Sequence, residues 1–180
     1  MVKLTKLFST DMPNHNQPIV SSDHLISESG PEQSELEYGL IIANNAFKRW
    51  IIHCVNASGA TGLNLNATDV LVLHNVFHRK RAKRVADICF TLDIEDTHLV
   101  AYALRKLRKL ELLDSEKHGK EVFFATTKRG QELCERYAEV RNHCLIESLN
   151  VDNKELGEVA RVLRMLSGLY DQAARAATSL

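Results

Sequence analysis

The sequence predicts a mainly α-helical fold that contains one small β-hairpin. Leu, Ala, Glu, Lys and Arg are plentiful and only three prolines occur in 180 residues, a composition that favours helices. Apolar residues recur at helical spacing in several long segments. Between residues 112 and 127, by contrast, Val, Phe and Thr gather around Gly119, which is typical of two strands joined by a turn.

The size and charge of the chain limit its class. Its length suits one domain, or one domain with an extra arm, and 44% apolar residues can fill a core. The 23 basic and 23 acidic side chains give zero net charge. This balance argues against a protein that coats nucleic acid without specificity, but it allows a local basic patch.

The four cysteines lie far apart and form no Cys-x-x-Cys pair, so we expect reduced thiols in a cytoplasmic protein. Redox sensing by Cys54 or Cys89 would need exposure and a lowered pKa. Both lie on apolar helical stripes, which favours an inert core position for each. No segment has the roughly 18 apolar residues of a membrane span, and the N-terminus has no signal pattern. We expect no membrane association.

The first third of the chain divides into an arm and a long helix. Residues 1–33 hold all three prolines and no sustained period, which predicts an arm that is loose or strapped to a partner. A helix is predicted over 34–57, with these residues at helical spacing: Leu36, Leu40, Ala43, Phe47, Trp50, Ile51 and Cys54.

Three shorter helices follow. Asn66, with Asp69 three residues later, predicts the start of a helix that ends near Phe77. The next helix is shorter and has three inward apolar residues, Val85, Ile88 and Cys89. Asp93 is the expected N-cap of the helix over 95–110. That helix has one apolar stripe, formed by Val100, Ala103, Leu104, Leu107 and Leu110.

The hairpin and two long helices complete the chain. The strands are expected to join at His118–Gly119. Thr127 can cap a helix that runs to about Leu149, and Asp152 with Glu155 resembles a capping box at the start of the last helix. Surplus apolar faces on 34–57 and 152–175 predict burial against a second copy, so we expect a homodimer.

The basic outer face of the helix over 95–110 is the strongest candidate site. A helix fits the major groove of DNA, where such side chains reach base edges. A solvated surface helix explains the pattern equally well. The candidate residues are Thr97, His98, Ala101, Tyr102, Arg105, Lys106 and Lys109.

Two further basic segments could contact the DNA backbone. Five of the six residues in "RKRAKR" are cationic, and we expect phosphate contacts from Arg79, Arg81, Lys83 and Arg84. The hairpin tip carries Lys117, His118 and Lys120, which could reach a minor groove. The alternatives are a solvated charge run and an ordinary polar turn.

The element order, with "VAYALRKLRKLELL" and "SEKHGKEVFFATTKRG", resembles the MarR family of winged helix-turn-helix transcription regulators over about residues 34–175. "ATTKRGQEL" resembles the family's Thr-x-x-Gly entry into the next helix. The resemblance implies a winged helix-turn-helix core flanked by long dimerisation helices, with first and last helices interlocked in an obligate homodimer. It also implies that helix 95–110 reads the major groove and that the wing at 114–125 touches the minor groove.

The chain departs from this family at the wing. The family often has an Asp-x-Arg-Arg run there, for which Lys120 is the stand-in, and its usual glycine before the first wing strand is Glu111. The expected division is an arm at 1–33, a dimerisation region at 34–60 and 129–180, and a DNA-binding lobe at 61–128.

The sequence therefore predicts a dimeric transcription regulator that binds double-stranded DNA in a sequence-specific manner. The alternative is a winged-helix module for protein interaction or ligand sensing without strong DNA binding, suggested by zero net charge and the atypical wing. An enzyme is disfavoured because neither common phosphate-binding fingerprint is present. In the family, small molecules often bind near the dimer helices, where Phe47, Trp50 and Tyr170 could line an effector site.

No cofactor is expected. His74 and His78 have the spacing of metal ligands on a helix, but a site needs further ligands and none lies nearby in the sequence. The pair His143–Cys144 is the only other candidate. Surface or partly buried imidazoles explain these histidines more simply.

Overall fold

A computed structural model of the chain describes residues 31–149 and 152–180. The described residues fall into two compact units, one that ends at Ser148 and one that begins at Leu149. Each is described by itself. Of the arm expected at 1–33, only the last three residues lie within the described part, and they already belong to the first helix.

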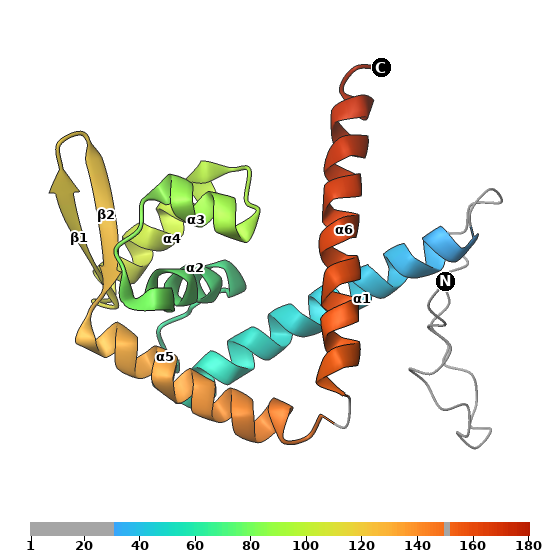
Figure 1. Ribbon diagram of the computed structural model, residues 1–180. Coiled ribbons are helices and arrows are strands. Elements are labelled where there is room, and N and C mark those ends of the chain that lie inside the picture. Colours follow the sequence, from blue (N-terminus) through green and yellow to red (C-terminus); the bar gives the residue numbers. More distant parts are fainter. Residues whose placement is uncertain (1–30, 150–151) are drawn as a thin grey trace. The chain divides into compact units, whose positions relative to one another are not determined.

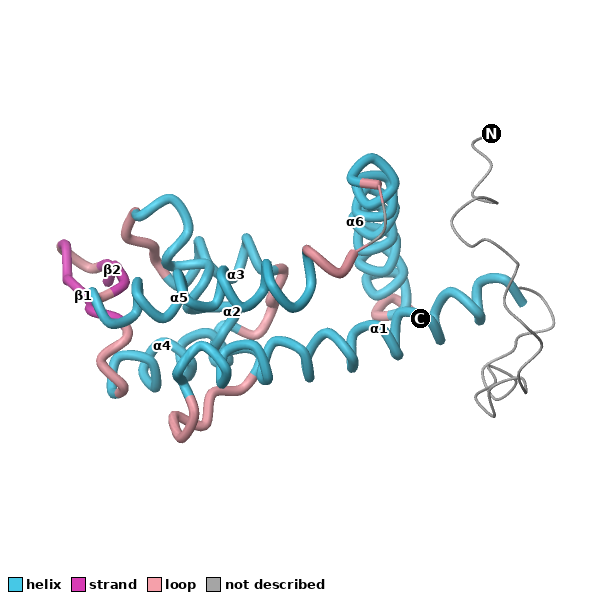
Figure 2. The backbone as a smooth tube through the Cα atoms, turned by 90° about the horizontal axis from the view of Figure 1, so that it is seen from below, coloured by secondary structure: helices cyan, strands magenta, loops and turns pink. Residues whose placement is uncertain are grey.

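The predicted order of helices, hairpin and helices is confirmed (Figures 1 and 2). Short helical turns follow α1, α2 and α5 at Asn56–Ala60, His78–Lys80 and Asn142–Ile146. The main elements are α1 (Pro31–Val55), α2 (Ala67–Phe77), α3 (Val85–Leu92), α4 (Thr97–Lys109), β1 (Leu113–His118), β2 (Glu121–Thr126), α5 (Lys128–Arg141) and α6 (Asn153–Ala177).

Side-chain caps begin α2 and α4. The Asn66 Oδ1 atom accepts from the Asp69 N–H at 2.8 Å, which confirms the predicted start of α2. The Asp69 Oδ2 atom also accepts from the Asn66 N–H at 2.9 Å, which completes a capping box. The expected N-cap of α4 at Asp93 is wrong. Asp93 ends α3 in a left-handed conformation, with φ of 54°, which Asp tolerates because its short side chain is polar. Asp96 caps α4 by accepting from the His98 N–H at 2.8 Å.

The antiparallel hairpin is confirmed, with its turn one residue later than expected. His118 pairs with Glu121, so Gly119 and Lys120 form the turn. Gly119 has φ of 63° and Lys120 has no positive φ, which fits a type II′ turn with glycine at its first central position. Lys83 and Phe124 exchange two backbone hydrogen bonds of 2.9 and 2.8 Å. The segment before α3 therefore lies along the free edge of β2.

The core of the first unit lies around α2, which packs against α1, α3, α4, α5 and β2. The apolar stripe of α4 faces it as predicted, because Val100, Ala103, Leu104 and Leu107 are at most 1% exposed. Only the last part of α1 joins this core, through Ile51, Cys54 and Val55, whereas Ile41, Ile42 and Phe47 are about half exposed.

The Thr-x-x-Gly sequence fixes the exit from the hairpin. The Thr127 hydroxyl accepts from the Gly130 N–H at 3.0 Å, which caps α5 as predicted. The Leu112 carbonyl, which accepts from the Thr127 N–H, lies directly against Gly130. A Cβ atom on Gly130 would be 2.1 Å from that oxygen, so only glycine fits. The α-helix ends at Arg141, earlier than the expected Leu149.

The second unit consists mainly of α6, whose apolar residues are exposed. Asp152 is its N-cap, but the Asp152 carboxylate accepts from the Lys154 N–H at 3.3 Å rather than forming a capping box with Glu155. No helix among the described residues has the length and apolar character needed to cross a membrane. The apolar residues that are at least a third exposed are Leu156, Val159, Leu163, Met165, Leu169 and Tyr170.

Candidate nucleic-acid interface

The outer face of α4 presents most of the predicted side chains to solvent. Thr97, His98, Tyr102, Arg105 and Lys109 are exposed, and Ala101 is half-buried. They share one face because the stripe through Val100 and Leu107 occupies the opposite one. Within the described part of the chain, the guanidinium of Arg105 and the ammonium of Lys109 form no ion pair. Both cations are therefore available to an anionic ligand.

Lys106 has a structural role instead. Its Nζ atom lies 2.6 Å from the Asp69 Oδ2 atom and 2.6 Å from the Asn64 carbonyl oxygen. Asp69 is fully buried in α2, so its carboxylate requires a cationic partner. The prediction that Lys106 contacts DNA does not fit this geometry, because the side chain joins α4 to the start of α2.

The basic run at 79–84 does not form one exposed patch. Lys83 is only 6% exposed, and its Nζ atom donates to the His78 carbonyl at 3.2 Å. Burial lowers the pKa of Lys83. The prediction that Lys83 binds phosphate does not fit this geometry, because the pairing of its backbone with Phe124 turns the side chain inward.

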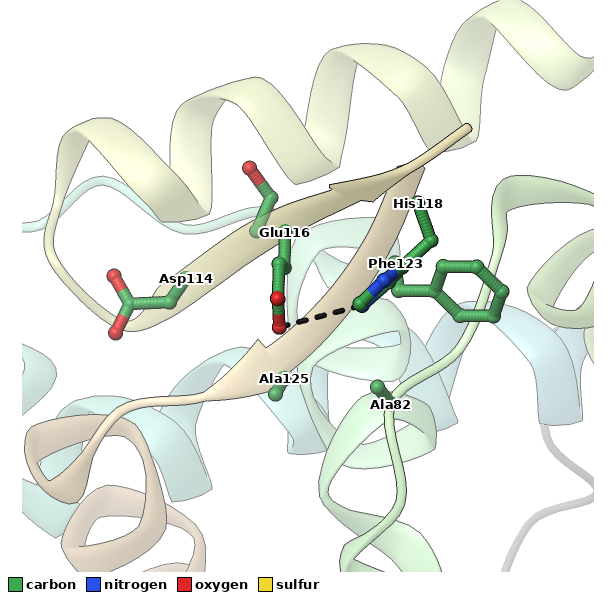
Figure 3. A pocket seen from close by; sticks show the side chains of 7 residues that line it. Ala82, Asp114, Glu116, His118, Phe123 and Ala125 are labelled. Atoms are coloured by element: carbon green, nitrogen blue, oxygen red, sulfur yellow. Dashed lines mark ion pairs between the residues drawn. The ribbon is translucent and has the colours of Figure 1, made fainter. Parts of the chain in front are cut away.

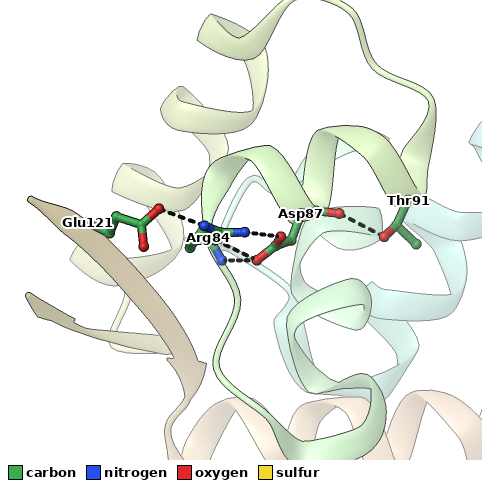
Figure 4. A network of polar contacts seen from close by, with 4 residues as sticks. All are labelled: Arg84, Asp87, Thr91 and Glu121. Carbon is green, nitrogen blue, oxygen red and sulfur yellow. Dashed lines mark hydrogen bonds and ion pairs between the residues drawn. The ribbon is translucent and has the colours of Figure 1, made fainter. Parts of the chain in front are cut away.

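Arg84 joins α3 to the wing (Figure 4). Its Nη1 atom is 2.6 Å from the Glu121 Oε1 atom, and its Nη2 atom is 3.0 Å from the Asp87 Oδ1 atom. The hydrogen bonds that Arg84 donates to the Asp87 carboxylate, from its side chain and its backbone, lower the pKa of Asp87 to about 2. Arg84 is thus already satisfied by two carboxylates, and its predicted phosphate contact would have to compete with both.

Arg79 and Arg81 remain exposed, together with Lys80. The antiparallel pairing of Lys83 with Phe124 aligns Arg81 with Thr126, at the base of the hairpin. The tip at Gly119 is about seven residues away from Thr126, which is roughly 23 Å of extended strand. This cationic group is therefore well separated from the hairpin tip.

The wing combines a cationic tip with an acidic outer face. Lys117 and Lys120 are exposed. On the outer face, the His118 Nε2 atom lies 3.3 Å from the Glu116 Oε2 atom, and the His118 ring meets Phe123 edge-on at 5.5 Å. An open groove of about 550 Å³ on this face (Figure 3) is lined by Ala82, Asp114, Ser115, Glu116, His118, Phe123 and Ala125.

The remaining histidines and cysteines have ordinary core or surface positions. His74 packs against the Tyr137 ring with centroids 4.3 Å apart, and burial lowers the pKa of His74 to about 4. The described residues contain no group of three or more His, Cys, Asp or Glu that could hold a metal ion. Cys54, Cys89 and Cys134 are buried, and burial raises the pKa of each thiol.

Leu99 was missed by sequence reasoning. It is 54% exposed on α4, whereas a leucine in an amphipathic helix is normally taken for a core residue. Its exposure could have been inferred from its position, because it precedes the buried stripe at Val100 and lies at its edge.

Comparisons with known proteins place this geometry in a known fold. Residues 65–130 match the family model of a winged helix DNA-binding domain. No curated protein matches the chain.

Solved structures match over most of the chain. Mutant MarR from E. coli, complexed with operator DNA, has 16% identity and a TM-score of 0.62 over 78% of this chain and 99% of that one. S. aureus MepR, in a DNA complex, has 16% identity and a TM-score of 0.58 over 73% and 96%. CouR from Rhodococcus jostii, bound to p-coumaroyl-CoA, has 12% identity and a TM-score of 0.53 over 72% and 90%. The expected winged helix fold is thereby confirmed, and the resemblance to MarR regulators is confirmed at the level of the fold.

Proposed function

We propose that this chain, a winged helix protein with the fold of the MarR regulators, is a transcription regulator that binds double-stranded DNA as a homodimer. The observation that carries the proposal is the outer face of α4, where Arg105 and Lys109 are exposed and form no ion pair in the described part of the chain. This face belongs to the segment that matches a winged helix DNA-binding domain.

The cationic side chains of α4 differ in whether a carboxylate of the same chain neutralises them. Lys106, the cation on the flank near α2, is neutralised by the buried Asp69. Arg105 and Lys109, on the outer face, have no such carboxylate within salt-bridge distance among the described residues. A helix that inserts into the major groove needs cations on the face that meets the DNA. We infer that Arg105 contacts a base edge and that Lys109 contacts a phosphate.

Dimerisation is supported by α6. Apolar residues follow one another in α6 at intervals of three and four residues, at Leu156, Val159, Leu163, Leu166 and Tyr170, which is the spacing of a coiled-coil seam. All but the half-buried Leu166 are more than a third exposed. An apolar seam of this length favours association with a second copy. Two copies would present two α4 helices, as recognition of a palindromic site requires.

We propose that only a small part of the β1–β2 hairpin, the wing, contacts DNA. The side chains of Asp114 and Glu116 lie on its outer face, away from the core, and would repel phosphates, whereas Glu121 is paired with Arg84. Lys117 and Lys120, near the turn, are the groups that suit a DNA backbone. We therefore propose that the tip alone approaches the duplex.

Selection of bound sequences from a random duplex pool, followed by affinity measurement in solution, tests the proposal. The unmodified chain should enrich one sequence and bind it much more tightly than an unrelated duplex. Arg105→Ala should weaken binding to the selected sequence by about 5- to 150-fold and relax the preference at one position. The matched control is Arg175→Ala near the end of α6, which should bind normally. If the dimer binds no duplex at low salt, the alternative of a protein-interaction or ligand-sensing module is favoured.

The phosphate contacts are tested by salt dependence. Lys109→Ala should weaken all duplexes alike and reduce the slope of log K against log salt by about 1. Arg81→Ala provides the comparison, since Arg81 lies at the base of the hairpin. A reduced slope for Arg81→Ala would show that the DNA extends to that end of the wing.

A regulator of this kind acts where the genome lies, so we propose a cytoplasmic location and no catalytic activity. A small-molecule effector is also part of the proposal, since one relative in fold was solved with p-coumaroyl-CoA. Phe47 is half exposed, whereas Trp50 packs against the core of the first unit. A shift in melting temperature on addition of an aromatic acyl-CoA, lost in Phe47→Ala, would support an effector site at α1.

A further inference from the structure

The first two turns of α4 expose apolar side chains that the core does not use. Leu99 is 54% exposed and Tyr102 is 60% exposed. Both lie outside the stripe formed by Val100, Ala103, Leu104 and Leu107, which is completely buried. Packing within the first unit therefore does not explain why these two positions carry large side chains with apolar surface.

Charge and apolar surface are segregated along this helix. From Thr97 to Leu104 there is no lysine or arginine, whereas Arg105, Lys106, Arg108 and Lys109 all follow in the second half. The turn between α3 and α4, where the first half begins, lies on the side of the lobe away from α5, as does the hairpin tip (Figure 1). A recognition helix presents its N-terminal residues to base edges, so the uncharged half is the half that would enter a groove.

The major groove contains one apolar group that such side chains can recognise. The C5-methyl group of thymine projects into it, whereas the other base edges present hydrogen-bond donors and acceptors. We propose that Leu99 and Tyr102 contact thymine methyl groups, so that each half-site of the recognised DNA carries thymine at fixed positions. This inference rests on the proposed function and assigns part of its sequence specificity.

The residues next to Leu99 and Tyr102 on α4 are also compatible with contact to thymine in a major groove. Ala101, which precedes Tyr102, is half-buried and small, so its side chain does not hold the backbone of α4 away from the base edges. Lys109, which follows Arg105 on the same face, can hold the helix against a phosphate. A protein partner would instead be expected to require a wider apolar surface than these two side chains offer.

Removal of single methyl groups from the DNA tests the inference. Each thymine of the selected duplex is replaced by uracil, which keeps the base pair and removes only the methyl group. At one or two positions in each half-site, the unmodified protein should bind about fourfold more weakly, the factor expected for one buried methyl group. At those positions Leu99→Ala or Tyr102→Ala should bind the thymine and uracil duplexes equally.

Two controls separate the possible failures. Arg105→Ala should retain the preference for thymine over uracil, and so should Val122→Ala, which removes an exposed apolar side chain on the wing. If the unmodified protein binds its selected duplex but ignores every uracil replacement, the inference is wrong and the proposed function stands. An unchanged preference in both Leu99→Ala and Tyr102→Ala would likewise overturn it. If no duplex is bound at all, the proposed function fails and the inference fails with it.

Discussion

Helices α4 and α6 carry the same kind of apolar stripe, but only one of them is covered. In α4, Leu104 and Leu107 are at most 1% exposed, whereas in α6 Leu156 is 39% and Leu163 is 44% exposed. Both stripes follow helical spacing. The difference is that α4 lies against α2, α3 and β1 within one unit, while α6 presents an apolar seam to solvent. Amphipathicity therefore identifies a face that must be buried, and does not say whether the same chain buries it.

The largest expected effect is a loss of folding stability from a substitution at Gly130, where the first unit leaves no room for a side chain. Gly130→Ala would place a Cβ atom 2.1 Å from the Leu112 carbonyl oxygen, and the exit from the hairpin would have to move. We expect a loss of about 3 kcal/mol or more in the free energy of unfolding, measured by urea denaturation. Gly39→Ala is the matched control, since its Cβ meets no atom within 4 Å, and it should be neutral or stabilising. Equal stability of the two variants would contradict this account of the Thr-x-x-Gly sequence.

The role of the exposed apolar stripe of α6 in self-association is tested by placing a charged side chain at its centre. Leu163→Asp should weaken self-association at least about 100-fold, because a carboxylate would be buried in an apolar seam. Sedimentation measures this directly, and circular dichroism should show that the first unit stays folded. Arg164→Asp, with a charge change at the adjacent exposed position, serves as the control. A monomeric unmodified chain, or a dimer that tolerates Leu163→Asp, would remove α6 from the interface.

The first unit, which contains His74, should lose folding stability as the pH falls. His74 is half-buried, and this burial lowers its pKa to about 4, whereas in the unfolded chain it takes a proton near pH 6.5. The unfolded state therefore binds more protons between these values, so stability falls as pH falls from about 6.5 to 4, by roughly 3 kcal/mol at most.

Thermal or urea unfolding across that range measures the effect. His74→Leu should flatten the pH dependence, and His98→Ala, which alters an exposed histidine, should leave it unchanged. An identical pH profile in all three proteins would show that His74 does not carry the effect.

The smallest expected effect concerns backbone strain at the start of the wing. Glu111 adopts a left-handed conformation, with φ of 58°, at the position where the resemblance leads one to expect glycine. Glu111→Gly should raise the melting temperature by stabilising the fold by up to about 1 kcal/mol. Glu116→Gly, within β1, is the control and should destabilise. A destabilised Glu111→Gly variant would mean that the ion pair with Arg129, at 3.6 Å, outweighs the strain.

Local sequence signals predicted the elements well. The capping pair Asn66 and Asp69, the Thr127 cap and the stripe of α4 all lie where their patterns indicated, because each depends on residues within one or two turns of the helix. The error at Asp93 has the same origin. Either aspartate in "DIED" can cap a helix, and the path of the chain between α3 and α4 selects Asp96.

The predictions for individual cations were less accurate, because they depend on distant partners. In "RKRAKR", Lys83 turns inward after pairing with Phe124, 41 residues later, and Arg84 is held by Glu121, 37 residues later. Lys106 is likewise neutralised by Asp69, 37 residues earlier. Nothing in the adjacent sequence distinguishes these three cations from the exposed Arg81, Arg105 and Lys109.

The amino-acid order alone determined the succession of helices and hairpin and the side of each helix that must avoid water, since these follow from spacing, capping and turn chemistry among near neighbours. Only the tertiary structure decided which basic side chains remain available to a ligand, that Leu99 is exposed, and that Gly130 must lack a side chain. The physical reason is that desolvation, ion pairing and steric contact act through space between segments whose proximity no local pattern encodes.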